Sequence, residues 1–398
     1  MRSADSFASS PGVDRGELAD EVARRRAVLA EAMERDGLDA VVVASEANAQ
    51  YLTGYETTFW GNLSKPFAVV LAPPARPCVV CHAGEAVSVR LDAIDVDVDP
   101  YVGPEVLEVS GGVQIDYQLP AADALAARLR ELGVERVGME RSWHFIPGLT
   151  PLAFERLGER LGFAPLDASG VLWSARRVKS AWEIGQMRIA GRVAGAAHEA
   201  FAEEARLGMT ERELNRLLRA LSYEAGAEKI GYSGIMAGID RAPLGGPTDR
   251  RWERGQMLFA DVCLQVNGYF ADFNRVYASG TPSDEQRRAY DDAVAALERG
   301  RELARAGTPI GELADAMIGD RPSPYARVGH GLGLEMPEPP SLSPLDGTPL
   351  LAGEVVCLEP NREVAGVGWV VSEETVVIGG GEPELLSPPF PPELRAIG

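Results

Sequence analysis

Five residues in this sequence have side chains that could bind metal ions, and each lies in its own short local pattern. In chain order they are Asp261, Asp272, His330, Glu359 and Glu373. Their carboxylate and imidazole groups, with no thiolate among them, suit a moderately hard divalent cation such as manganese, iron(II), cobalt or zinc. Four carboxylates around one ion would leave net negative charge, whereas two ions would neutralise them. The sequence therefore predicts a centre with two divalent metal ions.

The first two candidate ligands lie on a predicted β-hairpin. Residues 257–266 read as one strand, Asn267-Gly268 as a tight turn, and a second strand begins at Tyr269. Asn-Gly between apolar residues is a strong hairpin signal, and residues on two paired strands can share one face of the sheet. The turn would therefore bring together Asp261 and Asp272, which repel each other unless a cation lies between them. The alternative is that both are ordinary strand residues on a solvated face.

Catalytic proton transfer in such a centre is predicted to fall to a carboxylate. Glu359 is the candidate, because a carboxylate beside metal ions is well placed to move protons; a purely structural ligand role is the alternative. The chain has only four histidines. Two of them precede residue 150, and His198 lies in the helical run AGAAHEAFAEEA. Few histidines are therefore available for acid–base catalysis in this centre.

Composition limits the classes of protein to which the chain can belong. A length of 398 residues suits two domains, and 45% hydrophobic with 25% charged residues is ordinary for a globular protein. The net charge of -20 argues against nucleic acid and anionic membrane surfaces as partners. The first twenty residues lack the shape of a signal peptide, no apolar run approaches the ~20 residues that span a bilayer, and four cysteines suggest no disulfide framework. A cytoplasmic protein acting on a small molecule is expected.

The order of elements predicts two domains of different class. In residues 1–170, apolar strands alternate with helices, which indicates an α/β domain. In residues 171–398, three helix starts carry a hydroxyl residue followed three positions later by Glu or Gln, the capping-box pattern. These starts are at Ser180, Thr210 and Ser283, and the candidate ligands lie on strands between and after the helices.

The second domain resembles a known family of metalloenzymes. The segments GGPTDRRWERGQMLFADVC, NGYFADF, GHGLGLE, LEPN and EETVVI are similar to those of the pita-bread metallohydrolases: aminopeptidase P, prolidase, methionine aminopeptidase and creatinase. LDAVVVASEANAQYLTGY resembles the creatinase-type N-terminal domain. The resemblance implies an α+β pita-bread catalytic domain. It also implies that Asp261 serves one metal, that Asp272 and Glu373 bridge both, and that His330 and Glu359 serve the other.

The sequence departs from the family pattern at positions that handle peptides. A histidine expected upstream of the first aspartate is Leu244, a second histidine seven residues after His330 is Pro337, and an arginine two residues before Glu373 is Val371. We therefore predict a hydrolase of a small C–N substrate: an amide, a cyclic amidine or an atypical dipeptide. The alternatives are a metal-dependent lyase acting on a small acid and a non-catalytic binding module. Leu244 and Pro337 would line the substrate site.

The resemblance also implies a homodimer whose active site is completed by the partner. Relatives with this N-terminal domain commonly pair so that its loops approach the partner's metals. The matching segment here is YETTFWGNLSKPF, residues 55–67, and Trp60 and Lys65 could hold a small carboxylated substrate. The alternative is that Trp60 packs in the core and Lys65 is a solvated surface charge.

Overall fold

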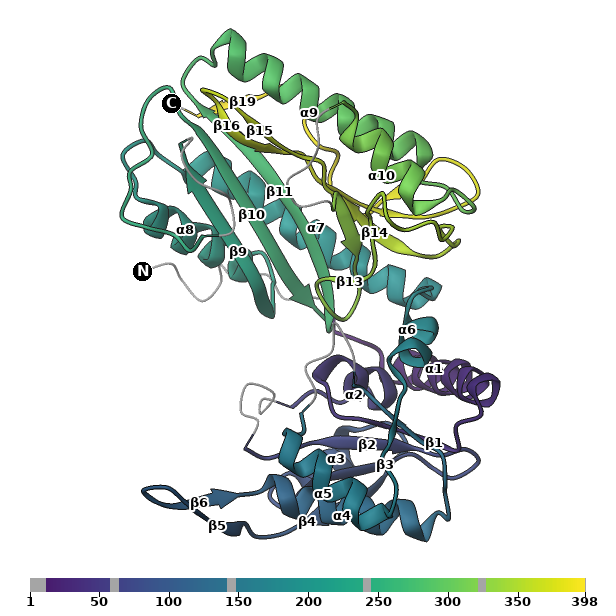
Figure 1. The fold of residues 1–398 in the computed structure, drawn as a ribbon. Coiled ribbons are helices and arrows are strands. Elements are labelled where there is room, and N and C mark those ends of the chain that lie inside the picture. The colour runs from purple at the N-terminus through teal and green to yellow at the C-terminus, as the bar shows by residue number, and fades with distance from the viewer. Residues whose placement is uncertain (1–11, 58–63, 142–147, 239–244, 321–326, 398) are drawn as a thin grey trace. The chain divides into compact units, whose positions relative to one another are not determined.

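The computed structural model describes residues 12–57, 64–141, 148–238, 245–320 and 327–397 (Figure 1). Two compact units divide the chain, one spanning Val13–Arg176 and one beginning at Arg177. The predicted boundary at residue 170 falls inside helix α6 (Ser169–Arg176) and is therefore too early. Helix α6 packs on α1 (Arg15–Asp36), and the Tyr51 hydroxyl donates to the Ala175 carbonyl at 3.0 Å, so α6 belongs to the first unit.

The first unit is built on a mixed six-stranded sheet with the order β4-β3-β2-β1-β7-β8. The strands are β1 Ala40–Val43, β2 Ala68–Leu71, β3 Cys78–His82, β4 Asp97–Tyr101, β7 Val137–Met139 and β8 Leu166–Asp167. A separate hairpin pairs β5 (Glu105–Val109) with β6 (Gly112–Asp116). The remaining helices are α2 Glu46–Thr53, α3 Ala86–Asp92, α4 Gln118–Glu131 and α5 Pro151–Leu161. This arrangement confirms the predicted α/β class.

Apolar strands hold the layers of this first unit together. Val42, Val70 and Val80 point from adjacent strands into one buried cluster with α4 and α5. Helix α1 contacts α2 and α6 instead. Helix α1 and strand β3 are part of the predicted alternation of helices and apolar strands. Among the described residues, no helix combines the length and the apolar character that crossing a membrane would require.

The second unit contains two main sheets and two pairs of helices. One sheet has the order β19-β11-β10-β9, the other β13-β12-β14-β17-β18, and β15 pairs with β16 separately. The strands are β9 Lys229–Ala237, β10 Met257–Val266, β11 Tyr269–Ser279, β12 Gly329–Gly331, β13 Glu338–Ser341, β14 Val355–Leu358, β15 Asn361–Val364, β16 Gly368–Val371, β17 Glu374–Val377, β18 Glu384–Leu385 and β19 Arg395–Ile397. The helices are α7 Ala181–Glu204, α8 Glu211–Glu224, α9 Asp284–Leu303 and α10 Ile310–Ile318.

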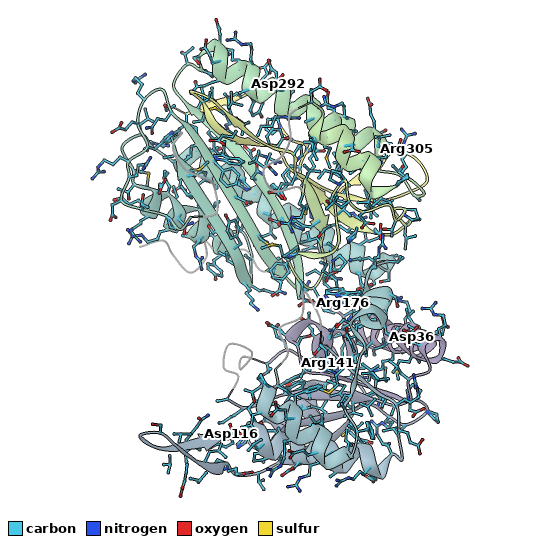
Figure 2. The ribbon with its side chains drawn as sticks, viewed as in Figure 1. Asp36, Asp116, Arg141, Arg176, Asp292 and Arg305 are labelled. Carbon is cyan, nitrogen blue, oxygen red and sulfur yellow. The ribbon has the colours of Figure 1, made fainter. Side chains whose placement is uncertain are left out.

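The three predicted capping boxes are confirmed. The side chains of Ser180, Thr210 and Ser283 each accept a hydrogen bond from a backbone amide three residues on, and the Glu or Gln side chain there accepts one from the backbone amide of the cap residue. These caps fix where α7, α8 and α9 begin, and each helix then packs an apolar face on a sheet. Helices α7 and α8 cover β9 to β11 through one buried cluster, while α9 and α10 cover β14 and β16 through another. Charged residues such as Asp292 and Arg305 lie exposed on or just after α9 (Figure 2).

A buried ion pair joins the start of the second unit to strand β13. Lys179 Nζ lies 2.9 Å from Glu338 Oε2, and both side chains are almost wholly buried. Glu338 also accepts a hydrogen bond from the Glu335 amide, so its carboxylate shapes the loop that leads from His330 through Pro337. Removing both charges from water costs free energy, so burying either charge without its partner would destabilise the fold.

We expect Lys179→Met to lower the free energy of unfolding by about 3–5 kcal/mol, because it leaves the Glu338 carboxylate buried without its cation. The double variant K179M/E338L removes both charges and should recover most of the loss. Urea unfolding followed by circular dichroism measures both variants. A K179M protein as stable as the wild type would show that the pair is not needed for the fold.

Candidate metal centre and active site

The β10–β11 hairpin places two predicted ligands on one face of its sheet. Asn267 and Gly268 both have positive φ, 52° and 82°, as a two-residue type I′ turn requires. The register pairs Asp261 with Asn274 and Cys263 with Asp272, so the two aspartates are diagonal neighbours. Alternate residues along β10, such as Leu258 and Val262, point the other way into the α7–α8 core. The predicted juxtaposition of Asp261 and Asp272 is therefore observed, and both side chains are buried rather than solvated.

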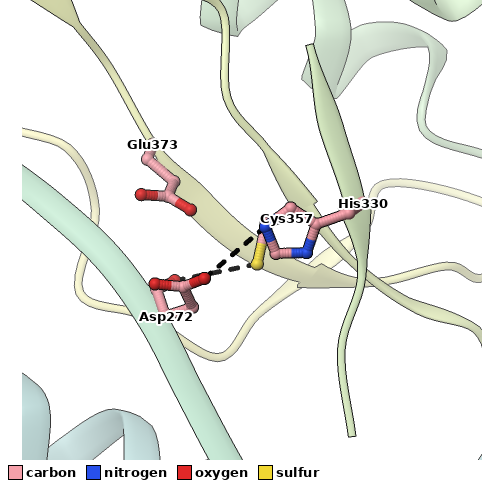
Figure 3. Close-up of side chains that lie close together, drawn as sticks. All are labelled: Asp272, His330, Cys357 and Glu373. Atoms are coloured by element: carbon pink, nitrogen blue, oxygen red, sulfur yellow. Dashed lines mark hydrogen bonds and ion pairs between the residues drawn. The ribbon is translucent and has the colours of Figure 1, made fainter. Parts of the chain in front are cut away.

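The second sheet brings His330 and Glu373 to the same place. His330 is the middle residue of β12 and pairs with Cys357 on β14, while Glu373 immediately precedes β17. Ligand atoms of Asp272, His330, Cys357 and Glu373 all lie within 4.8 Å of one another (Figure 3). A Cβ on either glycine flanking His330 would overlap a backbone carbonyl, that of Cys357 at Gly329 and that of Pro339 at Gly331. The glycines therefore allow β12 to lie close to both neighbouring strands.

The surrounding hydrogen bonds orient His330 for ligation. Its Nδ1 lies 2.9 Å from the Gly331 carbonyl oxygen, which can only accept a hydrogen bond. Nδ1 therefore carries the proton, and Nε2 presents its lone pair toward Asp272 Oδ2 at 3.5 Å.

Two further residues hold the aspartate and glutamate ligands. The Thr375 hydroxyl donates to the Asp272 carbonyl at 2.7 Å, and Asn274 Nδ2 donates to Glu373 Oε2 at 3.1 Å. These bonds connect β11 of one sheet to β17 of the other. The sequence analysis did not identify either residue, because only the pairing of the two sheets makes them neighbours.

The thiol of Cys357 lies beside three of the predicted ligands, although none of the five is itself a cysteine. Its Sγ lies 3.8 Å from the Asp272 carbonyl oxygen and 3.5 Å from the Thr375 hydroxyl. Burial, with the nearby charges of Asp272 and Glu373, holds the pKa of the Cys357 thiol well above its usual range. The thiol is therefore neutral in the metal-free chain and packs beside the carboxylates.

Asp261 and Glu359 lie outside the tight four-residue group but belong to the same acidic cluster. Burial is the main cause that raises the pKa of the Asp261 carboxyl, and the charge of Glu359 raises it further. The Glu359 side chain is partly exposed to solvent, yet burial still raises the pKa of its carboxyl. The positive charge of Arg327 opposes that rise. Burial likewise raises the pKa of Asp272 and Glu373, with added repulsion from the other carboxylates.

The residues present fit a pair of bound divalent cations. Oδ1 of Asp261 is buried without a hydrogen-bond partner in the described part of the chain, and so is Oδ1 of Asn274 directly across the hairpin. Buried acceptors without donors are costly, and cations would satisfy them. Four mutually repelling carboxylates and one oriented imidazole form a donor set suited to manganese, iron(II), cobalt or zinc.

Two residues beside the centre were missed by the sequence analysis. Tyr232 lies on β9 opposite Cys263, and a Cβ at Gly234 would overlap its hydroxyl, so the ring folds back along the ligand-bearing face. Burial raises the pKa of the Tyr232 phenol, and the charges of Asp261 and the other carboxylates raise it further. Arg327 is the second residue. Nothing in a single sequence marks either position as part of the site.

The predicted substrate-binding residues have different outcomes. Leu244 and Trp60 lie outside the described residues. Pro337 is partly exposed, directly before β13 on the loop that follows His330. Lys65 belongs to the first unit, where its Nζ lies 5.7 Å from the centre of the Tyr117 ring. The structure thus gives Lys65 a contact within its own unit, and its proposed role toward substrate stays a prediction.

Comparison with known proteins decides the family. Residues 185–379 match the model of metallopeptidase family M24, and residues 25–178 match that of the creatinase/prolidase N-terminal domain. The chain belongs to the creatinase/prolidase family. This creatinase-type protein is 26% identical over 359 residues to the Xaa-Pro dipeptidase of Pyrococcus horikoshii, a match covering 87% of the chain and 92% of that relative.

Two further relatives extend the comparison. The Xaa-Pro dipeptidase of Pyrococcus furiosus is 33% identical over 217 residues, which cover 52% of this chain and 62% of that protein. The solved Xaa-Pro dipeptidase from Bacillus anthracis has the same fold, with a TM-score of 0.80 at 22% identity, covering 94% and 100% of the two chains. Peptidases of this family use two divalent metal ions. The chain is therefore a metal-dependent hydrolase with the creatinase-type N-terminal and pita-bread C-terminal domains that the sequence predicted.

We expect the protein, loaded with manganese or cobalt and then desalted, to contain about two metal equivalents per chain. Asp272→Asn should lower that content and abolish activity, because it removes a buried anionic ligand at the centre of the cluster. Elemental analysis gives the metal content. Asp249→Asn is the matched control, since Asp249 is an exposed aspartate that pairs with the exposed Arg212, and it should behave as the wild type. A fully active preparation without metal would contradict the prediction.

Proposed function

We propose that this hydrolase cleaves a C–N bond in a small substrate, an amide, a cyclic amidine or an atypical dipeptide, rather than ordinary Xaa-Pro peptides. One observation carries the proposal. The sequence has all five candidate ligands, while the family resemblance implies that Leu244, Pro337 and Val371 replace two histidines and an arginine of the peptidases. Val371 is fully buried on β16, and Pro337 has no side-chain donor or acceptor.

The residues present support this chemistry. Asp261, Asp272, His330, Glu359 and Glu373 would hold the two ions, with manganese, iron(II), cobalt or zinc as candidates. Bound divalent ions would supply Lewis acidity and an activated water at this position. Glu359 is the partly exposed member of the cluster, so its carboxylate can take a proton from the attacking water and return it to the leaving nitrogen.

In this proposal, the lack of the two peptidase histidines limits which substrates the site can cleave. A leaving amine of an ordinary peptide needs a proton as the C–N bond breaks, and general acid–base help is typically worth ~10²–10⁴-fold. Leu244 and Pro337 cannot supply that proton. A substrate whose leaving group needs less assistance is therefore the better match.

We expect the metal-loaded protein to turn over Xaa-Pro dipeptides at least roughly 100-fold below the enzyme median of ~10 s⁻¹. The double variant L244H/P337H restores imidazoles at both positions and should increase that rate. Asp261→Asn, which removes a metal ligand, gives the background. Turnover of any Xaa-Pro dipeptide near the median by the wild type would refute the proposal.

A screen of small amides, amidines and dipeptides by mass spectrometry tests the reaction itself. A hydrolase adds one water across the substrate, so the product masses sum to substrate plus water. Products that sum to the substrate mass alone would instead identify the lyase alternative.

We also propose that the protein is a homodimer and that Lys65 and Trp60 of one protomer complete the other's site. The support is the matched creatinase/prolidase N-terminal domain together with the position of Lys65 over the Tyr117 ring. A cation–π contact positions the Lys65 ammonium without removing its positive charge.

Complementation between Asp261→Ala and Lys65→Ala tests this arrangement, with the substrate found in the screen. Each variant alone should be inactive. Random pairing on co-expression makes half of the dimers mixed, each with one intact site, so activity should recover to roughly a quarter of wild type. Mixed dimers that form without any recovery, or an active Lys65→Ala protein, would place Lys65 outside the partner's site.

A further inference from the structure

The β5–β6 hairpin of the first unit leaves the outer edge of one strand open. In the described part of the chain, β5 and β6 form a sheet of their own, and the hairpin extends away from the six-stranded sheet (Figure 1). Every residue of β6 except Asp116 is exposed. Two strands without a covering layer are only marginally stable, so a further strand paired with them would stabilise them.

Large apolar side chains gather on this hairpin although they face water. Val106, Val113 and Ile115 are 59%, 65% and 53% exposed. Val106 lies directly opposite Ile115, and Val113 is two positions from Ile115 along β6, so all three share one face. Single exposed apolar residues are ordinary on a protein surface, whereas a contiguous group of them marks an interaction surface.

The register of the hairpin decides which backbone groups of β6 are open. Residues 110–111 form a two-residue turn that is closed by the pair Val109 and Gly112. Such a turn is closed by a hydrogen-bonded pair, and bonded pairs then alternate with non-bonded pairs along the ladder. Val113 and Ile115 occupy non-bonded positions, so their N–H and C=O groups point away from β5. A third strand would meet these four groups.

Strand β6 is complementary to a second copy of itself. An antiparallel pair with its two-fold axis at Gln114 places Val113 opposite the partner's Ile115, and Gly112 opposite the partner's Asp116. The outward N–H and C=O groups of the two strands then meet, and apolar side chains lie opposite each other. The two Gln114 side chains face each other across the axis. No like charges are opposed in this register.

The charges of the hairpin favour β6 over β5 as the paired edge. The chain has a net charge of -20, yet β6 has a single charged residue, Asp116, which is buried. Strand β6 also lacks the Pro, Lys or bulge that protects many edge strands. Strand β5 has the exposed Glu108, and its Glu105 lies 3.2 Å from Arg156 of α5. These charges oppose the addition of a further strand at β5, so pairing would stop at two hairpins.

We propose that β6 pairs with β6 of a second copy of this chain, so that two hairpins form one four-stranded antiparallel sheet. A second copy is the partner because the register matches itself and the two-fold pairing is closed. The inference goes beyond the proposed hydrolase activity, since it assigns an association surface in the first unit. It is also independent of the role proposed for Lys65. A protein that used a second contact surface as well would form a tetramer.

Sedimentation of the full chain over a range of concentrations tests the pairing. The wild type should associate into dimers or tetramers. Val113→Pro removes one outward N–H from each copy, so two hydrogen bonds are lost by symmetry, and the dissociation constant of the pairing should rise roughly ten- to a hundredfold. Val106→Pro is the matched control. Its missing N–H points outward from β5, so this variant should associate as the wild type does.

A cysteine at the axis gives an independent measurement. Gln114→Cys would place two thiols opposite each other in a non-hydrogen-bonded pair, where Cα atoms lie about 4.5 Å apart, within the range of a disulfide. All four native cysteines are buried, so mild oxidation should link two chains through the new thiol. Glu108→Cys is the matched control, since two strands would separate it from its mate and no linked dimer should form. A non-reducing gel distinguishes the two.

Three results would overturn the proposal. The first is a wild type that stays monomeric. The second is a Val113→Pro protein with the thermal midpoint of the wild type that associates as tightly as the wild type. The third is a Gln114→Cys protein that cross-links no faster than Glu108→Cys, and this comparison decides alone if Val113→Pro does not fold. The hydrolase proposal is judged separately by the substrate screen, and the role of Lys65 by complementation.

Discussion

Repulsion among four buried carboxylates is the constraint on which the catalytic unit depends. Asp261, Asp272 and Glu373 are almost wholly out of water, and Glu359 adds a fourth charge beside them. Their raised pKa values show the cost of ionising them together. Burying like charges together lowers the stability of a fold, so stability alone does not account for this cluster. Divalent cations remove the repulsion, so the arrangement has a physical rationale only as a metal centre.

The architecture keeps this unfavourable cluster in place from two sides. One sheet supplies the aspartates on a hairpin whose opposite face is anchored to α7 and α8, and the other supplies His330 and the glutamates with α9 and α10 behind it. Thr375 and Asn274 connect the sheets at the ligands themselves. Rigid strands with packed outer faces hold the donors at fixed spacing, which a loop-built site would do less well.

Under the proposed function, the residues around the metal centre select the substrate. The ligands would activate water for many substrates alike, so selection falls to neighbouring side chains. Pro337 has no side-chain proton donor or acceptor, Tyr232 brings a phenol close to the carboxylates, and the positive charge of Arg327 lowers the pKa of Asp272. This division explains how a family of peptidases can keep one metal site and vary its chemistry by changing a few surrounding residues.

The sequence alone determined the local features. The Asn267-Gly268 turn and the three capping boxes depend on short-range rules, and the structure reproduces each of them. The family resemblance also identified the fold of both domains. The domain boundary was misplaced because α6 is held by long-range packing on α1, which no local pattern records.

Only the tertiary structure decided which side chains share the site. Cys357, Thr375 and Asn274 reach the ligands through the pairing of strands that are 85 to 103 positions apart in sequence from the contacts they make. Tyr232 faces the carboxylates because Gly234 leaves room for its ring. Arg327 lies just before β12, where the carbonyl of the next residue, Val328, accepts a hydrogen bond from the Glu359 amide. Residue type and spacing predict which side chains can bind metal ions. Which other side chains lie beside the metal site depends on contacts between residues that are far apart in the sequence.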